Sequence, residues 1–297
     1  MSALAIVNPA AGGGRCGRRY EAALDGLRAQ GHAIDVALTA SPGDATRLAR
    51  EAYAAGTRAF LAVGGDGTSY EIVNGLYPEA AEGEAPLLGF LPLGTGNSFL
   101  RDFTDEGADY ALEAWAAGKE RRCDVVRARH TQGAIHYINL LSVGFVADVN
   151  AFTCRHLKPL GEAGYSLGVV RQLAGLKPRA FPMTTAEGEA HGEPLVFASV
   201  NNSRFTGGKM MMAPHADTAD GRVDLVLCGA MGRFELLRTF PKIFTGAHVE
   251  TPKVTSTHVE GLRFDLDGPV DIMVDGEVER LQLTAIDILP SALRIAV

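Results

Sequence analysis

"FLAVGGDGTSYEIVNGL", residues 60–76, decides the fold of the first part of this chain. The apolar run 60–63 is typical of a buried strand, and the segment from residue 69 onward follows the pattern of a helix. Between them stand three glycines around one carboxylate, Asp66. Glycine accepts a positive φ and lets a backbone amide approach an anion closely. A strand that turns into a helix through such a loop therefore predicts a phosphate-binding site.

The first third of the chain alternates apolar runs with helical patterns. The predicted strands are 4–8, 32–39, 58–65 and 86–94, and the predicted helices are 18–31, 44–56, 69–77 and one that opens at 98. Asp44 begins the second of these helices and is predicted to cap it. Strands that are apolar throughout and separated by helices indicate a parallel sheet that is covered on both faces.

The pattern changes at about Arg127. A hairpin is predicted over 125–144, two helical insertions over 155–177 and 233–247, and further strands over 194–203, 221–229, 261–277 and 280–290. At 297 residues, two domains are expected. We predict an α/β domain with a parallel sheet over 1–127 and a mostly antiparallel β domain over 128–290. The last strand, at about 291–297, is expected to return to the first domain.

The composition is that of an ordinary globular protein. It is 46% hydrophobic and 21% charged, and its formal net charge is −7. A negative chain is a poor partner for nucleic acid, because phosphate neutralisation needs a basic face. The four cysteines form no CxxC pair, no apolar run is long enough to span a bilayer, and the N-terminus lacks a basic leader. We expect a cytoplasmic protein with reduced thiols; its oligomeric state is left open, a homodimer included.

Three loops at equivalent strand ends are rich in glycine. They are "NPAAGGGR" after the first strand, "GGDGTS" after the third and "LGTGNS" after the fourth. In doubly wound sheets this edge binds ligands at helix N-termini, so the three loops together predict a polyphosphate cradle. Asp66 would repel phosphate at close range unless a bridging Mg²⁺ takes oxygens from both. It is therefore expected to hold that metal or to orient a substrate hydroxyl.

Two other interpretations of the glycines stay open at this point. Gly12, Gly14 and Gly17 satisfy GxGxxG after the first strand, as in NAD(P)-dependent oxidoreductases. That motif needs an acidic residue at the end of the second strand, whereas Asp35 comes early in it. The glycines are otherwise simply turn formers. A P-loop is excluded, because GxxxxGK[ST] does not occur.

"VGGDGTSYEIVNGL" with "LPLGTGNSFLRDF" downstream resembles the diacylglycerol kinase catalytic domain family, which includes bacterial soluble lipid kinases and sphingosine and ceramide kinases. The resemblance runs nearly the whole length. "NPAAGGGR", "LLSVGFVADV", "ADGRVDLVL" and "VDGE" match further motifs of that family in the same order. NAD kinases share GGDGT and the first fold unit, but the chain has no counterpart to their Asn-Glu segment.

The resemblance implies a two-domain kinase with its active site in the interdomain cleft, and it assigns roles by position. Glu277 of "VDGE" resembles the general base of the family, and Asp66 the acidic residue near the acceptor or the catalytic metal. Asp220, with main-chain oxygens around Asp217 and Arg222, resembles the structural Mg²⁺ site of the bacterial members. The residues implied in ATP binding are Asn8, Thr39, Gly64, Gly65, Asp66, Gly67, Thr68, Gly94, Thr95, Gly96 and Asn97.

The chain departs from the family pattern in two segments. Ser98 stands where bacterial members often have Asp. In "GGKMMMAPHA", Lys209 and Met211 stand where glycine and a basic residue are usual, and His215 where Asp is common. These departures fall beside the implied nucleotide loop and the implied metal site.

Two segments are candidates for lipid contact. Segment 155–179 carries five Arg or Lys residues against one Glu, interleaved with apolar residues, which is typical of a helix on an anionic bilayer surface. An insertion packed on the β domain explains it equally well. Phe205 and the methionines 210–212 are candidates for an acyl groove, because methionine adapts to flexible chains.

We therefore expect an ATP- and Mg²⁺-dependent lipid kinase that meets membranes peripherally. Its substrate is expected to be diacylglycerol, with a sphingoid base or another glycerolipid as the second choice. An alternative from a different class is a catalytically silent lipid- or nucleotide-binding protein on the same scaffold. An oxidoreductase is the minor alternative.

Overall fold

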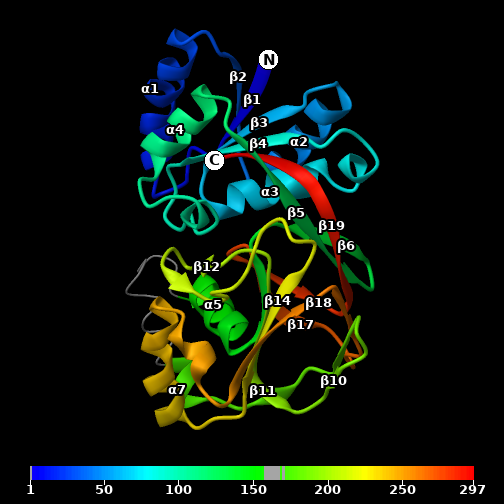
Figure 1. The fold of residues 1–297 in the computed structure, drawn as a ribbon. Helices are drawn as coiled ribbons and strands as arrows, with labels where there is room; N and C mark the ends of the chain where they lie inside the picture. The colour runs from blue at the N-terminus through cyan, green and yellow to red at the C-terminus, as the bar shows by residue number, and fades with distance from the viewer. Residues whose placement is uncertain (1, 157–167, 169–170) are drawn as a thin grey trace.

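The computed structural model describes residues 2–156, 168 and 171–297, and it has two lobes (Figure 1). The N-terminal part of the chain and the C-terminus lie together in one lobe, and the strands from β7 to β18 build most of the other. The predicted class, an α/β part with a parallel sheet joined to a mostly antiparallel β part, is confirmed.

The first lobe is a parallel sheet in the order β4-β3-β1-β2, with helices on both faces. Helices α2 and α3 pack in the apolar cluster around Phe60 and Leu88, and α1 and α4 in the cluster around Leu61 and Leu91. The bounds are β1 Ser2–Val7, α1 Arg15–Ala29, β2 Ala33–Leu38, α2 Asp44–Ala54, β3 Ala59–Gly64, α3 Asp66–Leu76, η1 Glu79–Ala81, β4 Leu87–Pro92, η2 Leu100–Asp102 and α4 Ala108–Ala116.

The second lobe is an antiparallel sheet in the order β15-β14-β11-β7-β17-β18, with β8 beside β11. Helix α5 and the segment from α7 to η5 pack on one face in the cluster around Phe197 and Val226. A two-stranded ribbon, β12-β13, lies apart from that sheet. The bounds are β7 Leu140–Gly144, α5 Phe145–His156, β8 Arg179–Ala180, β11 Pro194–Asn201, β12 Phe205–Thr206, β13 Met210–Met211, β14 Val223–Gly229, α7 Arg233–Thr239, η4 Phe240–Phe244, η5 Ala247–Glu250, β15 Val254–Val259, β17 Val270–Val274 and β18 Glu277–Leu281.

One long strand, β19 (Leu283–Ala296), runs from one lobe to the other (Figure 1). It pairs antiparallel with β5 and β16, and its last residues, 294–296, run parallel to β4. The end of the chain thus extends the first-lobe sheet. The remaining strands are β5 Glu120–His130, β6 Gly133–Tyr137, β9 Met183–Thr185, β10 Ala190–His191 and β16 Gly261–Phe264.

The structure departs from the predicted elements in several places. The segment predicted as a strand over 261–277 forms two strands, β16 and β17, which belong to different sheets. Helix α5 starts directly after β7, ahead of the predicted insertion at 155–177, most of which lies outside the described residues. The helix predicted from residue 98 is a single 3₁₀ turn, η2. The predicted hairpin ends at Tyr137, because β7 joins the other sheet. Asp44 is the first residue of α2 and not its cap, which is the left-handed Gly43.

Candidate active site between the lobes

A cleft of about 710 Å³ opens between the lobes, a size typical of ligand-binding pockets. Its walls come from the carboxyl ends of β1, β2, β3 and β4 on one side and from the turn between β17 and β18 on the other. The lining residues are Asn8, Pro9, Ala10, Ala11, Gly12, Thr39, Ala40, Ser41, Pro42, Ala45, Gly65, Asp66, Gly67, Thr68, Glu71, Gly94, Thr95, Gly96, Asp275, Gly276 and Glu277.

The glycine loops of the first lobe pack backbone against backbone. A Cβ on Gly94 would lie 2.6 Å from the Cα of Gly65, and the Gly94 amide donates to the Gly64 carbonyl at 2.7 Å. Gly12, with φ +61°, brings the first loop to the same place, where a Cβ would lie 2.7 Å from the Leu93 carbonyl oxygen. Any larger residue would separate these loops, so the glycines form one surface of main-chain atoms that fits a polyphosphate.

Asp66 holds the neighbouring loop in place. Both of its carboxylate oxygens accept the Ser98 amide at 2.8 Å, and Oδ1 also accepts the Phe99 amide at 3.4 Å. Asn97, in a left-handed conformation with φ +50°, donates its side-chain amide to the Gly94 carbonyl at 3.2 Å. Burial raises the pKa of Asp66. The carboxylate therefore fixes the turn that follows β4 as well as lining the cleft.

Most of the residues predicted to bind the nucleotide are brought together. Nine of the eleven line the cleft, and the other two, Gly64 and Asn97, line a small space behind Asp66. The Thr68 hydroxyl is buried beneath Gly64, where it has no hydrogen-bond partner among the described residues. Asp35, which an oxidoreductase would need at the end of the second strand, lies opposite Leu4 in mid-strand instead.

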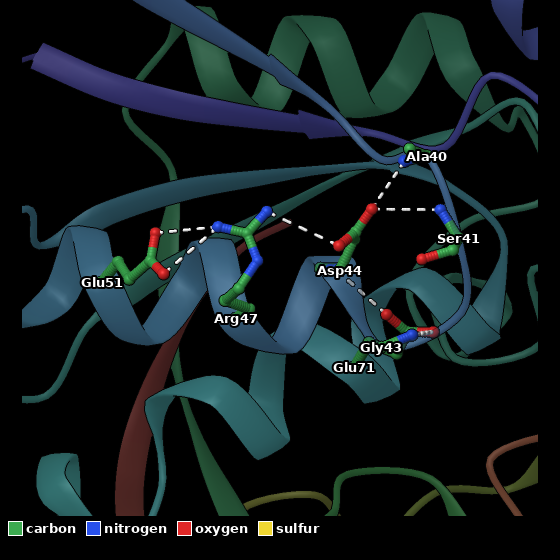
Figure 2. Close-up of polar contacts among 8 residues, drawn as sticks. Ala40, Ser41, Gly43, Asp44, Arg47, Glu51 and Glu71 are labelled. Atoms are coloured by element: carbon green, nitrogen blue, oxygen red, sulfur yellow. Dashed lines mark hydrogen bonds and ion pairs between the residues drawn. The ribbon is translucent and has the colours of Figure 1, made fainter.

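The loop between β2 and α2 is held by two carboxylates (Figure 2). Glu71 of α3 accepts the Gly43 and Ala45 amides, each at 3.0 Å, and Asp44 accepts those of Ala40 and Ser41 at 2.8 and 3.0 Å. These contacts satisfy the amides that a helix start would otherwise offer to an anion. The Gly43 and Ala45 amides are therefore already occupied, although the loop that contains Gly43 forms a wall of the cleft. Sequence reasoning missed Glu71, which acts on a turn 28 residues away.

The turn between β17 and β18 is built around Asp275, which sequence reasoning also missed. Its Oδ1 accepts the amides of Asn139 and Leu140 at 3.1 and 3.0 Å, and its Oδ2 accepts that of Ile138 at 3.2 Å. The residue has φ +45° and is 2% exposed. Burial raises the pKa of Asp275 to about 7. The sequence "VDGE" carried the signal, since it places an aspartate directly before a left-handed glycine.

Glu277 follows this turn and reaches the opposite wall. It is an exposed residue at the start of β18, and its Oε1 lies so close to Gly67 that a Cβ there would be 2.3 Å away. The predicted acid and the predicted phosphate loop, 210 positions apart in the sequence, thus meet across the cleft.

An apolar cavity of about 100 Å³ adjoins the same turn. It is bounded by α5, the β12-β13 ribbon and the α7-η4 segment, and it reaches Gly276. Of the four residues predicted for an acyl groove, Met210 and Met212 line it. Its lining residues are Phe145, Val146, Val149, Asn150, Phe197, Thr206, Gly207, Met210, Met212, Leu236, Phe240, Ile243, Met273 and Gly276.

The residues predicted for the structural metal lie outside the cleft lining. The Asp217 carboxylate accepts the Ala219 amide at 3.0 Å, and that of Asp220 accepts the Arg222 amide at 2.9 Å. Over 2–156, 168 and 171–297, no three His, Cys, Asp or Glu side chains are grouped in a way that could hold a metal ion. The hydrogen bonds of Asp217 and Asp220 belong to the turns that precede β14.

Two family models together match nearly the whole chain. The diacylglycerol kinase catalytic domain matches residues 2–128, and the YegS C-terminal NAD kinase beta sandwich-like domain matches 139–297. A diacylglycerol kinase of Mycobacterium tuberculosis is 28% identical over 98% of this chain and 93% of its own length. A "Probable lipid kinase YegS-like" of Chromohalobacter salexigens is 33% identical over 86% of this chain and 81% of its own.

Solved structures share the fold. A crystal structure from Bacillus anthracis superposes with a TM-score of 0.79 at 23% identity, over 99% of this chain and 96% of that one. A second, of a diacylglycerol kinase from the same organism, gives a TM-score of 0.70 at 19% identity. Among the described residues, none of the helices has both the length and the apolar character needed to span a bilayer.

Proposed function

The chain belongs to the family of bacterial diacylglycerol kinases and YegS-like lipid kinases, and on that premise we propose that it phosphorylates a lipid hydroxyl with ATP. Diacylglycerol is the first substrate that we propose, with a sphingoid base or another glycerolipid as the second. The α/β part, 1–127, would bind the nucleotide, and the β part, 128–290, the lipid.

The contact of Glu277 with Gly67 carries this proposal. An acid that lies against a phosphate-binding loop is placed to take a proton from an acceptor bound between them. In the proposed step, the lipid oxygen forms a bond to the γ-phosphorus while the bond from that phosphorus to the β–γ bridging oxygen breaks. ADP leaves, and the hydroxyl proton passes to the Glu277 carboxylate.

The glycine loops would hold the triphosphate by main-chain amides. Gly65, Gly67, Gly94 and Gly96 would form the surface that faces the triphosphate, with Thr68 and Thr95 beside them, and Asn8 and Thr39 would lie at the nucleotide edge. Mg²⁺ would neutralise phosphate charge when bound, and the cleft carboxylates Asp66 and Glu277 are the residues that would hold it. A structural Mg²⁺ at Asp217, Asp220 and the Arg222 carbonyl is a separate proposal.

The apolar cavity supports a lipid as the acceptor. It meets the cleft at Gly276, one residue from the proposed base, so an acyl chain in it would leave its polar head beside Glu277. Methionines suit such a wall because they adapt to flexible chains. A catalytically silent binding protein would have the cavity without needing the acid.

The test is a phosphorylation assay with labelled ATP on a panel of diacylglycerols, monoacylglycerols, sphingosine and ceramide. Glu277→Gln keeps the size of the side chain and removes the base, so kcat should fall by about 10²- to 10⁴-fold. Glu279→Gln, the same change two residues along β18, is the matched control and should retain activity.

Each outcome decides between the candidates. A folded wild type that binds ATP and phosphorylates no lipid on the panel would favour the silent protein. Full turnover in Glu277→Gln with lipid phosphate as product would keep the kinase and remove the base assignment.

A further inference from the structure

Large apolar side chains are exposed on one segment of the second lobe. Phe234 is 86% exposed, Leu237 49% and Phe244 51%, and all three lie on α7 and η4. In the part of the chain that the structure describes, the one other large apolar residue so exposed is Leu38, on β2 of the first lobe. A concentration of this kind marks a surface that contacts another apolar phase.

Cations surround these apolar side chains. Arg233, Arg238 and Lys242 are exposed, and none of them forms an ion pair with the described residues. The one acid of the segment, Glu235, is neutralised by Lys253 at 2.8 Å. The segment 233–244 therefore presents a positive, aromatic face on a chain whose net charge is −7.

The opposite side of the same segment forms a wall of the apolar cavity. Leu236, Phe240 and Ile243 line the cavity that reaches Gly276 beside the proposed base. They recur at the spacing of one helical face, and the exposed Phe234 and Leu237 lie on another. Figure 1 places α7 on the outer side of the second lobe, next to α5. The segment 233–244 thus forms both a wall of the apolar cavity and part of the outer surface of the second lobe.

We propose that the exposed face of 233–244 docks on the surface of an anionic lipid bilayer. Aromatic residues would enter the headgroup region, and the three cations would meet anionic headgroups, which is the composition that interfacial helices use. Docking in this way brings the wall of the cavity to the membrane, so a lipid can pass from the bilayer into the cavity. This last step rests on the proposed lipid kinase function; the docking itself does not.

This face is distinct from the segment 155–179 singled out in the sequence. Most of that segment lies outside the described residues. In its described part, Arg179 is neutralised by Asp148 at 2.8 Å, and Leu173 is only 8% exposed in the apolar cluster that also contains Leu236. Those two residues have protein partners, whereas Arg233, Arg238 and Lys242 form no ion pair with the described residues, and Phe234 is 86% exposed.

The test measures co-sedimentation of the full chain with vesicles of phosphatidylcholine alone and with about 30 mol% phosphatidylglycerol, at low and high salt. Wild type should bind the anionic vesicles and lose binding as salt rises. Phe234→Ser with Phe244→Ser, and separately Arg233→Gln with Arg238→Gln, should each weaken binding by about tenfold. All four residues are exposed, so folding should be unaffected.

Matched controls lie on the first lobe. Leu38→Ser removes an exposed apolar side chain, and Arg19→Gln with Lys119→Gln removes two exposed cations; both should bind vesicles like wild type. Equal binding by all variants, or binding of wild type that ignores lipid charge and salt, would overturn the proposal. So would a dimer, shown by sedimentation velocity, that the two phenylalanine changes dissociate while vesicle binding is absent.

The kinase assay separates docking from the proposed function. Phosphorylation of lipid presented in anionic vesicles should fall in the phenylalanine variant, and that of a dispersed short-chain diacylglycerol should not. Vesicle binding without any lipid phosphorylation in wild type would contradict the proposed function and leave the docking surface supported.

Discussion

The loop 64–68 and the turn 274–277 face each other across the cleft and share one construction. Each contains Asp-Gly, and each buries its aspartate against backbone amides of another segment: Asp66 accepts from 98–99 and Asp275 from 138–140. They differ in what they present to the cleft. The first presents glycine backbone, and the second presents the Glu277 side chain.

On the proposed function, this difference shows what each side would contribute. Amides fixed by a rigid loop stabilise phosphate charge without reorganising during reaction, whereas moving a proton needs an ionisable side chain. In both cases the buried aspartate is a support. The two supports also share a neighbour. The side-chain amide of Asn74, on α3, donates to the His136 carbonyl at 2.8 Å and accepts the His136 amide at 2.9 Å, just before residues 138–140.

Gly67→Ala should produce the largest effect on this contrast. The new Cβ would lie 2.3 Å from Glu277 Oε1, so the flexible carboxylate must swing out of the cleft while the backbone stays in place. A misplaced catalytic group costs about 10²-fold, so we expect kcat/KM to fall by about that factor. Stability should hold or rise, because alanine favours the helix α3. Steady-state kinetics and thermal unfolding measure the two effects.

Gly26→Ala on α1 is the matched control, since a Cβ there meets nothing within 4 Å. It should gain stability by about 0.5–1 kcal/mol and keep full activity. Normal kinetics in Gly67→Ala would mean that the position of Glu277 against the loop does not matter. The proposed division of roles, with glycine backbone on one wall of the cleft and the Glu277 carboxylate on the other, would then be contradicted.

Asp275→Asn should lower the unfolding free energy of the protein more than Asp66→Asn does. Asparagine tolerates the left-handed conformation of residue 275, but its amide would replace the oxygen that accepts from Ile138. One buried donor without a partner costs about 1–3 kcal/mol of unfolding free energy. At Asp66, one oxygen accepts from both Ser98 and Phe99, so asparagine can keep both bonds. Urea unfolding of the two variants measures the loss of unfolding free energy. Equal losses would mean that the number of carboxylate oxygens that accept hydrogen bonds does not distinguish Asp66 from Asp275.

The two sides also differ in what their sequences reveal. Glycine loops are predictable because their requirement is local: positive φ at Gly12 and a close approach at Gly94 allow little else. The roles of Glu71 and Asp275 are not predictable from the sequence, because the amides that they accept from lie far away in the chain or on another strand. Asp44 followed the local rule for a cap, yet Gly43 and Glu71 satisfy that helix start instead.

Helix α5 was missed for a related reason. The run "LLSVGFVADV" is largely apolar, and periodicity does not separate a buried strand from a buried helix in such a run. The change from β7 to α5 occurs at Gly144, with φ +87°, where a Cβ would lie 2.6 Å from the Val196 carbonyl oxygen. That close approach is a tertiary contact, so it cannot be predicted from the sequence alone.

Acid should weaken the shared support. Burial and, to a smaller extent, the nearby Arg127 lower the pKa of His136 to about 4, against an opposing effect of Asp287. A depressed histidine pKa means that the unfolded chain takes up the proton first, so this stability is present above about pH 6.5 and is lost toward pH 4. We expect a loss of about 2 kcal/mol of unfolding free energy between pH 7 and pH 5. His136→Phe keeps a ring against Tyr77, 5.4 Å away, and should lack this part of the acid sensitivity.

Unfolding curves at pH 7 and pH 5 measure the difference between the two proteins. A wild type and a His136→Phe variant with the same dependence on pH would contradict the assignment. If wild type loses more unfolding free energy on acidification than the variant, and also loses activity faster, then β6, which carries His136, supports both walls of the cleft.

Ser98→Ala should give the smallest effect, and it tests whether the two walls act together. The Ser98 amide is held by Asp66, and its hydroxyl accepts the Gly208 amide at 2.9 Å, next to Gly207 of the apolar cavity. Losing this bond should cost about 1 kcal/mol and raise the KM for lipid about fivefold, more than that for ATP. Ser199→Ala removes another buried hydroxyl, one that accepts from Ser142 and donates to Asn201, each at 2.8 Å, so it should cost at least as much stability without this bias. Ser98→Thr should restore the lipid KM. Both alanine variants could instead change the KM for lipid and the KM for ATP by the same factor. A general loss of stability would then explain the result, and the hydrogen bond between Ser98 and Gly208 would have no specific effect on lipid binding.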